Sequence, residues 1–344
     1  MKIVIPAYEP TNKVLTLIEE IQTLSTLEII VINDGSGKEY KQIFEEIEKR
    51  NVIVLTHEKN KGKGEAIKTG IRYLIKNKEN EGCVFADCDG QHTVKDIIKV
   101  QETLINNNKD IVIGVRDFNQ KDIPTRSKIG NKISKVLFQI MTGIKIADTQ
   151  TGLRAYSASI FNWLLNIEGS RYDYEFNILL KIKEDGISYD EVEIETIYED
   201  KNKQSHFNPI KDSILIYKTV IKFFLSSLLA FVIDFSLLLI FQYIFRNLLV
   251  SVIFSRAISS FVNFACNKNY VFERKNDKNT IEMLIKYYAL VIVIMILNYL
   301  ILNLLYNGLN INIIISKIIT EVFLYLLSFI MQKRVVFKNS KNRS

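Results

Sequence analysis

Cysteine is scarce in this chain of 344 residues. Its three cysteines, Cys83, Cys88 and Cys266, are scattered and odd in number. Such a set provides neither a disulfide framework nor a zinc site, and it suits a reducing compartment. We also expect no signal peptide, because residues 1–6 read as a buried strand and not as a basic segment ahead of a long apolar stretch. We therefore expect the first domain to stay in the cytoplasm.

Nucleic-acid-binding motifs are absent as well, although the formal net charge is +7 at pH 7. A basic chain can bind nucleic acid or anionic lipid. Without a recognisable motif, positive charge alone does not support nucleic-acid binding. We expect no nucleic-acid partner and a protein that sits on an anionic membrane surface.

Long apolar runs, by contrast, fill the second part of the chain, where Ile, Leu, Val and Phe dominate. A bilayer core about 30 Å thick needs roughly 20 apolar residues per helix. Four buried helices of a large soluble core are the alternative, but the runs are long and nearly free of charge. The sequence thus predicts domains at residues 1–215 and 216–344, with transmembrane helices at about 220–245, 248–267, 283–306 and 312–332.

Basic residues gather on one side of the predicted spans. The loop between the first two spans and the loop between the last two offer only Arg246. The remaining polar segments contain Lys268, Arg274, Lys275, Lys278 and Lys286, then Lys333, Arg334, Lys338, Lys341 and Arg343. Because excess Lys and Arg marks the cytoplasmic side, we expect a multi-pass cell-membrane protein with both termini and the first domain in the cytoplasm.

The first domain alternates apolar runs with amphipathic stretches, which predicts an α/β fold with a mostly parallel sheet. Expected strands are residues 2–5, 28–32, 52–55, 83–86 and 111–115, and expected helices are 12–24, 38–50, 65–77 and 94–107. Ligands bind at the carboxyl ends of the strands in such sheets. The polar turns at residues 6–9, 33–36 and 87–92 should therefore lie along one edge.

Residues 121–143 combine basic and apolar residues at helical spacing. This pattern predicts a basic amphipathic helix at a membrane interface. An ordinary surface helix with a solvated basic face is the alternative.

The turn at residues 87–92 carries the strongest chemical signal. On an extended chain Asp87 and Asp89 point to one side and Cys88 to the other. Two carboxylates with the amide oxygen of Gln91 form a hard oxygen site, which suits Mg²⁺ or Mn²⁺ shared with phosphates. A lone D-x-D pair is common in turns, but this one follows an apolar strand and shares an edge with two other polar turns.

Four motifs occur in order with consistent spacing: IVIPAYE at residues 3–9, VINDGS at 31–36, NKGKG at 60–64 and DCDGQH at 87–92. They resemble the motifs of the family 2 glycosyltransferases. Within that family they are most similar to the polyprenyl-phosphate sugar transferases, of which dolichyl-phosphate mannose synthase is the best-known type. The resemblance covers roughly residues 1–215, and it implies a GT-A fold, a divalent cation and inversion at the anomeric carbon.

The resemblance also assigns roles to residues around the donor. The base and ribose would be bound by Pro6, Tyr8, Glu9 and Asp34. Asp87 would lie against the donor, and Asp89 and Gln91 would complete the metal site. Loop packing and turn formation are the alternatives for the base-binding residues. Lys63 either touches the diphosphate or is a solvated loop lysine.

On the acceptor side, Arg116 and Arg126 resemble the family's phosphate-binding arginines, and residues 148–154 resemble its D-x-x-x-G-x-R signature. Asp148 would orient the phosphate or Arg154 would clamp it, unless the two form a structural pair. A lipid phosphate is already anionic and needs no general base. Positioning by arginines and stabilisation of the departing diphosphate then suffice, although Asp87 could assist.

The second domain resembles the GtrA-like membrane domain through FVID at residues 231–234, SRAIS at 255–259 and NF with NKNYVF at 263–272. Residues 222–224 recur at 286–288 and residues 267–272 recur at 332–337, so each repeat is a two-span hairpin. Ionisable residues inside spans are costly, which makes Asp234, Arg256 and Glu321 candidates for an interior polar cluster. Simple attachment of one helix to another is the alternative.

These features together predict transfer of a sugar from a UDP- or GDP-linked donor to a polyprenyl phosphate at the cytoplasmic membrane face. A processive polysaccharide synthase would carry a Q-x-x-R-W motif, but the single tryptophan is Trp163, in FNWL. A non-enzymatic carrier of lipid-linked sugar would not need the set Asp87, Asp89 and Gln91. The sequence leaves open the sugar, the nucleotide, the choice of cation and whether the chain forms a homo-oligomer.

Overall fold

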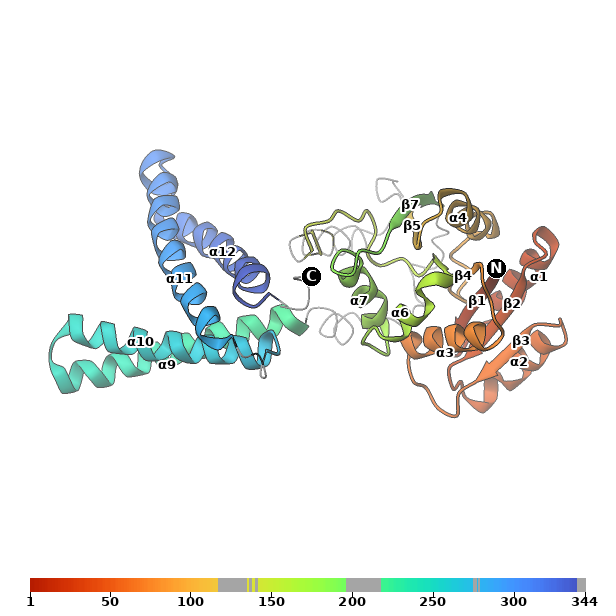
Figure 1. Ribbon diagram of the computed structural model, residues 1–344, viewed down its shortest axis with the longest axis horizontal. Coiled ribbons are helices and arrows are strands. Elements are labelled where there is room, and N and C mark those ends of the chain that lie inside the picture. Colours follow the sequence, from red (N-terminus) through yellow and green to blue (C-terminus); the bar gives the residue numbers. More distant parts are fainter. Residues whose placement is uncertain are drawn as a thin grey trace. The chain divides into compact units, whose positions relative to one another are not determined.

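The computed structural model describes residues 1–116, 135, 138–139, 142–195, 218–274, 277 and 279–338. The chain forms two compact units, Met1–Ile216 and Tyr217–Ser344 (Figure 1). Because their relative placement is not determined, each unit is described by itself.

The first unit is built on a seven-stranded sheet with the strand order β3-β2-β1-β4-β6-β5-β7. The strands are β1 (Lys2–Ala7), β2 (Glu28–Asn33), β3 (Ile53–Thr56), β4 (Gly82–Phe85), β5 (Ile111–Arg116), β6 (Arg154–Ser157) and β7 (Tyr189–Ile194). Only β6 runs antiparallel to its neighbours, β4 and β5. Continuous apolar runs such as residues 3–5 are buried on both faces, as a covered parallel sheet requires. The predicted α/β architecture is confirmed.

Helices cover both faces of this sheet. They are α1 (Lys13–Leu24), η1 (Lys38–Tyr40), α2 (Lys41–Glu48), α3 (Lys63–Lys76), α4 (Val94–Asn107), η2 (Ala158–Ile160), α6 (Phe161–Leu165) and α7 (Tyr172–Ile182). Helix α1 buries Val14, Leu17, Ile18 and Ile21, a stripe at helical spacing that joins the core formed with α2 and α4. Helix α3 lies so close to β1 that a Cβ on Gly70 would approach Val4 Cγ1 to 2.8 Å.

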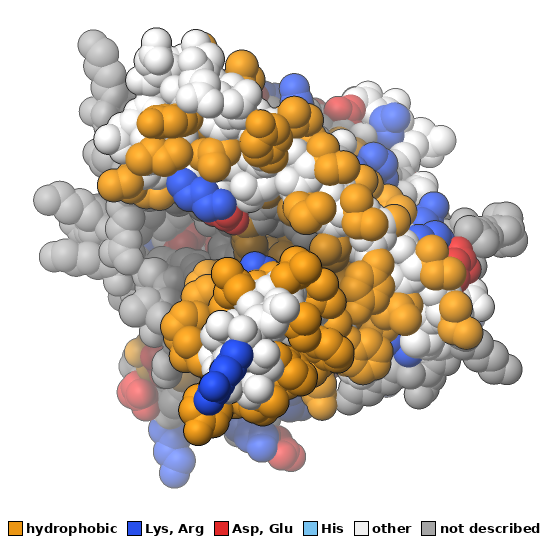
Figure 2. All heavy atoms as spheres, turned by 90° about the vertical axis from the view of Figure 1, so that its left-hand side faces the viewer, with side chains coloured by type: hydrophobic (Ala, Val, Ile, Leu, Met, Phe, Trp, Pro, Cys, Tyr) orange, Lys and Arg blue, Asp and Glu red, His pale blue; other side chains and the backbone are white. Residues whose placement is uncertain are grey.

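The second unit contains four helices that are long and apolar enough to cross a membrane: Lys218–Phe245, Leu248–Val271, Thr280–Gly308 and Ile313–Val336. In order they comprise α9 (Lys218–Phe245); α10 (Leu248–Cys266) with η4 (Asn267–Val271); α11 (Thr280–Asn303) with η5 (Leu304–Gly308); and α12 (Ile313–Met331) with η6 (Gln332–Val336). Large apolar side chains such as Phe231 and Tyr243 point outward, and hydrophobic side chains dominate the face shown in Figure 2. A lipid-facing surface has this character.

The helices form two hairpins, α9 with α10 and α11 with α12, which meet at η4 and η6 (Figure 1). There Asn267 Nδ2 donates to Gln332 Oε1 at 2.9 Å, and these residues are 65 positions apart. Phe272 stacks on Phe337 with ring centroids 4.9 Å apart. The residues in contact occupy equivalent positions of the two predicted repeats.

Candidate active site

The polar turns that follow β1, β2 and β4 meet at one edge of the sheet, as predicted. Strand β1 lies between β2 and β4, and all three run parallel. The first two turns are joined directly, because Glu9 N donates to Ser36 Oγ at 2.9 Å and Asp34 N donates to the carbonyl oxygen of Ala7 at 2.8 Å. The turn after β4 carries Asp87 and Asp89 next to them.

Lys63 connects Asp87 to a second carboxylate. Its Nζ lies 2.7 Å from Asp87 Oδ1 and 3.0 Å from Glu175 Oε2. Lys63 is the first residue of α3, and Glu175 lies in the first turn of α7. Both charged side chains are therefore positioned at this edge of the sheet by the N-terminus of a helix. Burial alone would lower the pKa of Lys63, but the charges of Asp87 and Glu175 raise that pKa above its usual value. The amine is therefore a permanent cation.

The same interaction controls the charge of Asp87. Burial alone would raise the pKa of Asp87, but the charge of Lys63 holds that pKa well below its usual range. Gly152, from the segment ahead of β6, lies directly against this ion pair. A Cβ on Gly152 would lie 2.3 Å from Asp87 Oδ2 and 2.6 Å from Lys63 Nζ. The glycine of the predicted signature is thus required by the close approach of its backbone to the ion pair.

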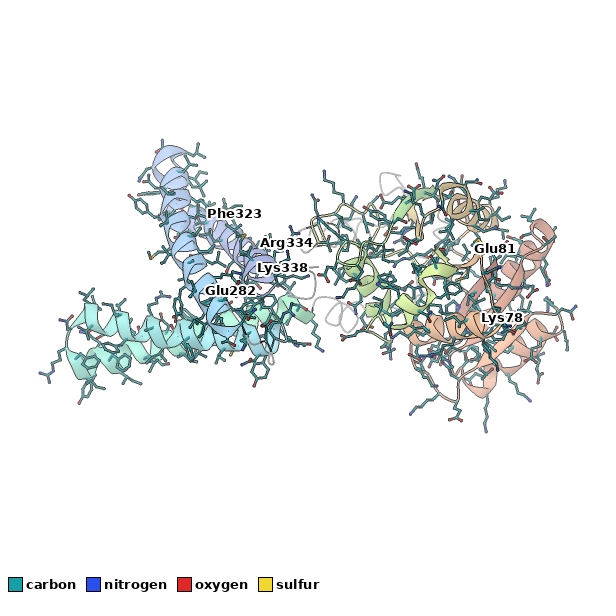
Figure 3. The ribbon with its side chains drawn as sticks, viewed as in Figure 1. Lys78, Glu81, Glu282, Phe323, Arg334 and Lys338 are labelled. Atoms are coloured by element: carbon teal, nitrogen blue, oxygen red, sulfur yellow. The ribbon has the colours of Figure 1, made fainter. Side chains whose placement is uncertain are left out.

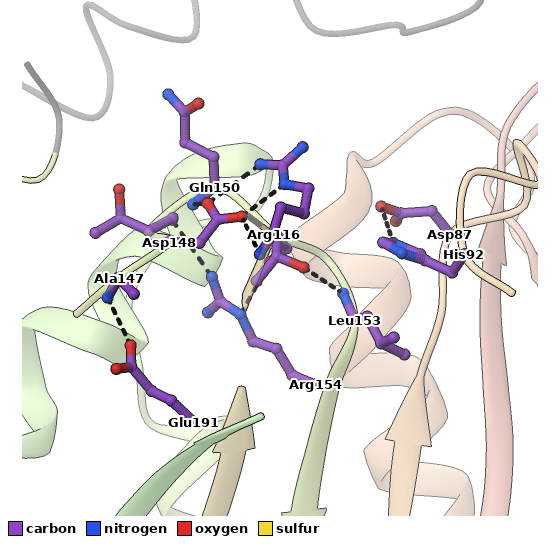
Figure 4. A network of polar contacts seen from close by, with 11 residues as sticks. Asp87, His92, Arg116, Ala147, Asp148, Gln150, Leu153, Arg154 and Glu191 are labelled. Carbon is purple, nitrogen blue, oxygen red and sulfur yellow. Dashed lines mark hydrogen bonds and ion pairs between the residues drawn. The ribbon is translucent and has the colours of Figure 1, made fainter. Parts of the chain in front are cut away.

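Asp89 and Gln91 continue the turn. The pKa of Asp89 is raised by burial and by the negative charge of Asp87, and the backbone N–H of Gln91 donates to Asp89 Oδ1 at 3.1 Å. His92 is buried, with Nε2 3.6 Å from Asp87 Oδ2 (Figure 4). Cys88 instead packs against the core of the sheet, so the predicted alternation holds.

This donor set fits a divalent cation. Two adjacent carboxylates disfavour each other's charge, and a cation would relieve that repulsion. Among the described residues, no group of three or more His, Cys, Asp and Glu side chains could hold a metal by itself. Mg²⁺ and related ions commonly use one or two carboxylates and complete their shell with phosphate oxygens. Asp87, Asp89 and Gln91 match that mode.

The predicted base-binding residues have different environments. Tyr8 and Glu9 are half-buried, and a hydrogen bond to Glu9 is the main cause of the raised pKa of Tyr8. Pro6 is buried near the end of β1, just ahead of this turn, and its contact with a donor stays a prediction. Asp34 is 2% exposed and accepts hydrogen bonds from the backbone amides of Lys61 and Gly62. Contact of Tyr8, Glu9 and Asp34 with a donor stays a prediction.

Arg116 and Asp148 form a two-point ion pair (Figure 4). Arg116 Nε donates to Asp148 Oδ2 at 2.6 Å and Nη2 donates to Oδ1 at 3.1 Å. The Asp148 side chain is fully buried, whereas that of Arg116 is 15% exposed. Asp148 thus directs the guanidinium of Arg116, which points to a positioning role for the aspartate.

Arg154 corrects an expectation. The sequence suggests that it clamps an acceptor phosphate or pairs with Asp148, but its side chain is 1% exposed. Its guanidinium donates to the backbone carbonyls of Thr151, Glu175 and Thr149. A buried cation bound to three carbonyls braces the segment around Gly152 against α7, so a direct phosphate contact does not fit this position. Arg126 and most of the amphipathic segment 121–143 lie outside the described residues.

Two residues of this site were not foreseen from the sequence. Glu175 is one, and the only hint was an acidic and aromatic run, YDYE at residues 172–175, directly ahead of an apolar helix. His57 is the other, with Nδ1 2.7 Å from Asp34 Oδ1. A histidine at the end of a predicted strand gives no signal of its own.

The three ionisable residues expected to form one cluster in the membrane unit, Asp234, Arg256 and Glu321, lie in two separate groups. Asp234 Oδ2 lies 3.5 Å from Arg256 Nε, and Ser259 Oγ donates to Asp234 Oδ1 at 2.9 Å. Glu321 instead pairs with Lys317 at 2.6 Å and accepts from Asn298 at 3.1 Å. Two members of the expected cluster, Asp234 and Arg256, therefore do form a pair, but Arg256 is 74% exposed, so an interior position for it is wrong. The aliphatic stem of an arginine allows its head to leave the packed interface.

Comparison with protein families gives two matches along the chain. Residues 2–165 match the model described as glycosyl transferase family 2, and residues 222–337 match the GtrA/DPMS transmembrane domain. The first match lies within the first structural unit and the second match within the second.

Individual relatives agree with these matches. The chain is 31% identical over 214 residues to a UDP-N-acetylglucosamine–dolichyl-phosphate N-acetylglucosaminyltransferase of Methanococcus voltae, covering 57% of this chain and 85% of that protein. It is 25% identical over 247 residues to a dolichyl-phosphate beta-glucosyltransferase of Dictyostelium discoideum, covering 64% and 73%. Among solved structures, mannosyl-3-phosphoglycerate synthase from Rubrobacter xylanophilus matches with a TM-score of 0.50 at 15% identity, covering 64% and 71%.

Proposed function

Because this chain belongs to glycosyl transferase family 2, we propose that its sheet edge transfers a sugar from a nucleotide sugar to a polyprenyl phosphate. The chain is a glycosyltransferase with a GT-A fold, and it is a multi-pass membrane protein. The observation that carries the proposal is the convergence of Asp87, Lys63, Glu175 and Gly152 beside Asp89, at the edge where such sheets bind ligands. The relatives named for dolichyl phosphate support this choice of acceptor.

On the donor side, Tyr8, Glu9 and Asp34 are the residues that we assign to the base and ribose. Lys63 supplies a fixed positive charge toward the diphosphate. Asp89 and Gln91, with Asp87, would hold a Mg²⁺ or Mn²⁺ ion, whose positive charge would stabilise the departing diphosphate. Asp87 and Asp89 orient the donor so that its anomeric carbon is open to attack.

On the acceptor side, a phosphate oxygen forms a bond to the anomeric carbon while the bond from that carbon to the diphosphate oxygen breaks. Attack from the side opposite the leaving group inverts the anomeric configuration. No proton has to be removed, because the phosphate is already anionic. Arg116 would bind this phosphate, together with Arg126, and Asp148 fixes the direction of the Arg116 guanidinium.

The membrane unit supports a reaction at the bilayer surface, because it would hold the chain in the membrane that contains the lipid acceptor. One of its charged contacts, the pair of Lys222 and Glu273, joins the start of α9 to the segment just after η4. Figure 3 shows Glu282, Arg334 and Lys338 at that end of the unit and Phe323 further along α12. By the positive-inside rule this end faces the cytoplasm, and so do both termini and the first unit.

The test uses membranes that contain the full chain, polyprenyl phosphate and labelled UDP- and GDP-sugars offered one at a time. We expect a single lipid-linked sugar from at least one donor. A polymer would indicate a processive synthase instead, and no product from any donor would contradict the proposal. Membranes with the Asp89→Ala variant provide the background.

A further inference from the structure

We propose that His57 is a positioning residue of the donor site, which holds the carboxylate of Asp34 and, through it, the loop that leads to Lys63. The inference rests on the proposed function, because it assigns Asp34 and Lys63 to the donor. It concerns a side chain to which neither the sequence motifs nor the comparisons give a role.

His57 lies where three elements meet. It follows β3 directly, and its backbone amide donates to the carbonyl oxygen of Asn33, at the end of β2, at 2.9 Å. Its ring nitrogen Nδ1 lies 2.7 Å from Asp34 Oδ1, and Nε2 lies 2.9 Å from Thr69 Oγ1 on α3. The side chain is 6% exposed, so both interactions are shielded from water.

The partners define the direction of each hydrogen bond. An ionised carboxylate only accepts, so Nδ1–H donates to Asp34. In the neutral imidazole Nε2 then accepts from the Thr69 hydroxyl. Both ring nitrogens of His57 are therefore held, one by Asp34 and one by Thr69, and this fixes the position of the ring against the Asp34 carboxylate.

Asp34 transmits this orientation to the loop after β3. Its Oδ1 accepts from Lys61 N at 2.9 Å and its Oδ2 accepts from Gly62 N at 2.8 Å. The backbone of this loop also packs closely against Gly35, where a Cβ would be 2.2 Å from the carbonyl carbon of Lys59. Gly62 has a φ of +97°, a conformation that favours glycine, and Lys63 follows at once.

The position of Lys63 Nζ between Asp87 and Glu175 thus depends on a loop anchored by Asp34 and His57. If His57 releases the Asp34 carboxylate, both the base-binding turn and the diphosphate-facing amine lose their fixed positions. The acceptor arginine Arg116 belongs to β5 and pairs with Asp148, outside this chain of contacts. A loss at His57 should therefore affect the donor and spare the acceptor.

Two substitutions distinguish the role of Nδ1 from the role of Nε2. His57→Asn places an amide nitrogen near Nδ1 and keeps the bond to Asp34, whereas His57→Gln reaches toward Nε2 and gives that bond up. Thr69→Val is the matched control, because it removes the partner of Nε2 and leaves Asp34 alone. Each full-length variant is assayed for the KM of the nucleotide sugar, the KM of polyprenyl phosphate and calorimetric binding of UDP and of GDP.

We expect His57→Gln to raise the donor KM about tenfold, the effect of losing one hydrogen bond to a charged group. The acceptor KM should stay unchanged, and nucleoside diphosphate binding should weaken by the same factor. His57→Asn and Thr69→Val should keep the donor KM within about threefold of wild type, because both retain the hydrogen bond to Asp34 and lose at most one neutral hydrogen bond away from the donor.

An unchanged donor KM in an active His57→Gln enzyme overturns the inference and leaves the proposed function standing. Equal rises in the donor and acceptor KM values overturn it too, because they indicate a general loss of structure. If His57→Gln does not fold, His57→Asn decides: a retained donor KM supports positioning, and a tenfold rise refutes it. A wild-type enzyme that is inactive with every donor contradicts the proposed function instead.

Discussion

Around Asp87, one cation lies among several carboxylates. Lys63 Nζ contacts both Asp87 and Glu175, and Asp89 follows two positions after Asp87. With one ammonium among three carboxylates the formal charge is negative, which favours a divalent cation and disfavours a bare diphosphate. Donor and cation are therefore expected to bind together, each offsetting charge that the other brings.

Asp89 provides the first prediction at this scale. Asp89→Ala should weaken Mg²⁺ and Mn²⁺ binding in calorimetry and lower kcat about a hundredfold or more, the usual effect of removing a group that stabilises leaving-group charge. The melting temperature should hardly change, because the hydrogen bond that the Asp89 side chain accepts comes from Gln91 N in the same turn and joins no distant part of the fold. Glu20→Ala, an exposed change on α1, is the control. Near-normal transfer by chelator-treated wild type would show that no cation is needed.

Gly152 provides the second prediction. Gly152→Ala places a methyl group where Asp87 Oδ2 and Lys63 Nζ lie, at 2.3 and 2.6 Å. Both atoms end flexible side chains, so we expect the protein to fold while the ion pair shifts. A displacement of about 1 Å can lower a rate by up to a hundredfold, and kcat/KM for the donor should fall by about tenfold to a hundredfold.

The control for this variant is Gly308→Ala in the membrane unit, whose added Cβ meets only Leu304 Cδ1, at 3.3 Å. That protein should retain full activity. A fully active Gly152→Ala enzyme would show that the position of the Asp87–Lys63 pair does not matter for transfer.

Individual residues could be predicted from sequence where a short motif carries them. Asp87, Asp89 and Gln91 are contiguous, so local spacing was enough to group them. Glu175 and His57 come from segments with no recognisable pattern, and only tertiary packing brings them to the site. Arg154 was misread because a buried arginine that binds backbone carbonyls and an arginine that binds phosphate look the same in a sequence.

At the scale of elements, strands and helices with a clear apolar period were predicted to within a few residues. The strands β1 to β5 and the helices α1 to α4 belong to this group. Strands β6 and β7 were not predicted, because RAYS and YDEVEI combine charged and apolar residues and lack a continuous apolar run. Strand β6 is antiparallel, and it returns the chain so that Gly152 and Asp148 approach the β4 edge.

The hairpin of α9 and α10 provides a prediction for this scale. Asp234→Asn or Arg256→Gln alone should destabilise the protein in detergent more than the double variant does, because each single change leaves one charge at mid-span without its opposite. The coupling free energy should lie at about 0.5–3 kcal/mol in a double-mutant cycle of detergent unfolding. Strictly additive losses would refute a coupled pair.

The second hairpin supplies the comparison for that cycle. Lys317 and Glu321 are four residues apart on α12 and both are about half exposed. Such a pair within one helix contributes only about 0.2–0.5 kcal/mol. The cycle on Lys317→Gln and Glu321→Gln should therefore give a smaller coupling than the pair that joins two helices.

At the scale of the whole molecule, apolar content alone separated a membrane segment from the rest, because helices that cross a bilayer need a length and composition that cores of soluble domains rarely have. The internal repeat was also visible in sequence. The contacts between the two repeats could not be predicted from the sequence. Those of Asn267 with Gln332 and of Phe272 with Phe337 depend on how the two hairpins meet.

Membrane orientation provides the last prediction, which joins the charge pattern to the chemistry. Nucleotide sugars are cytoplasmic substrates in the proposed reaction, so the η4–η6 end with its basic residues should face the cytoplasm and the loop between α9 and α10 should face outward. In a background without the native cysteines, Arg246→Cys should react with a membrane-impermeant maleimide in intact cells. Asp277→Cys, between α10 and α11, should react only after the membrane is opened. Asp277 is chosen because its replacement removes no positive charge, and the cysteine-free parent measures background labelling. The reverse pattern would place the basic end outside the cell, away from the donor, and would force a different account of how the enzyme meets its nucleotide sugar.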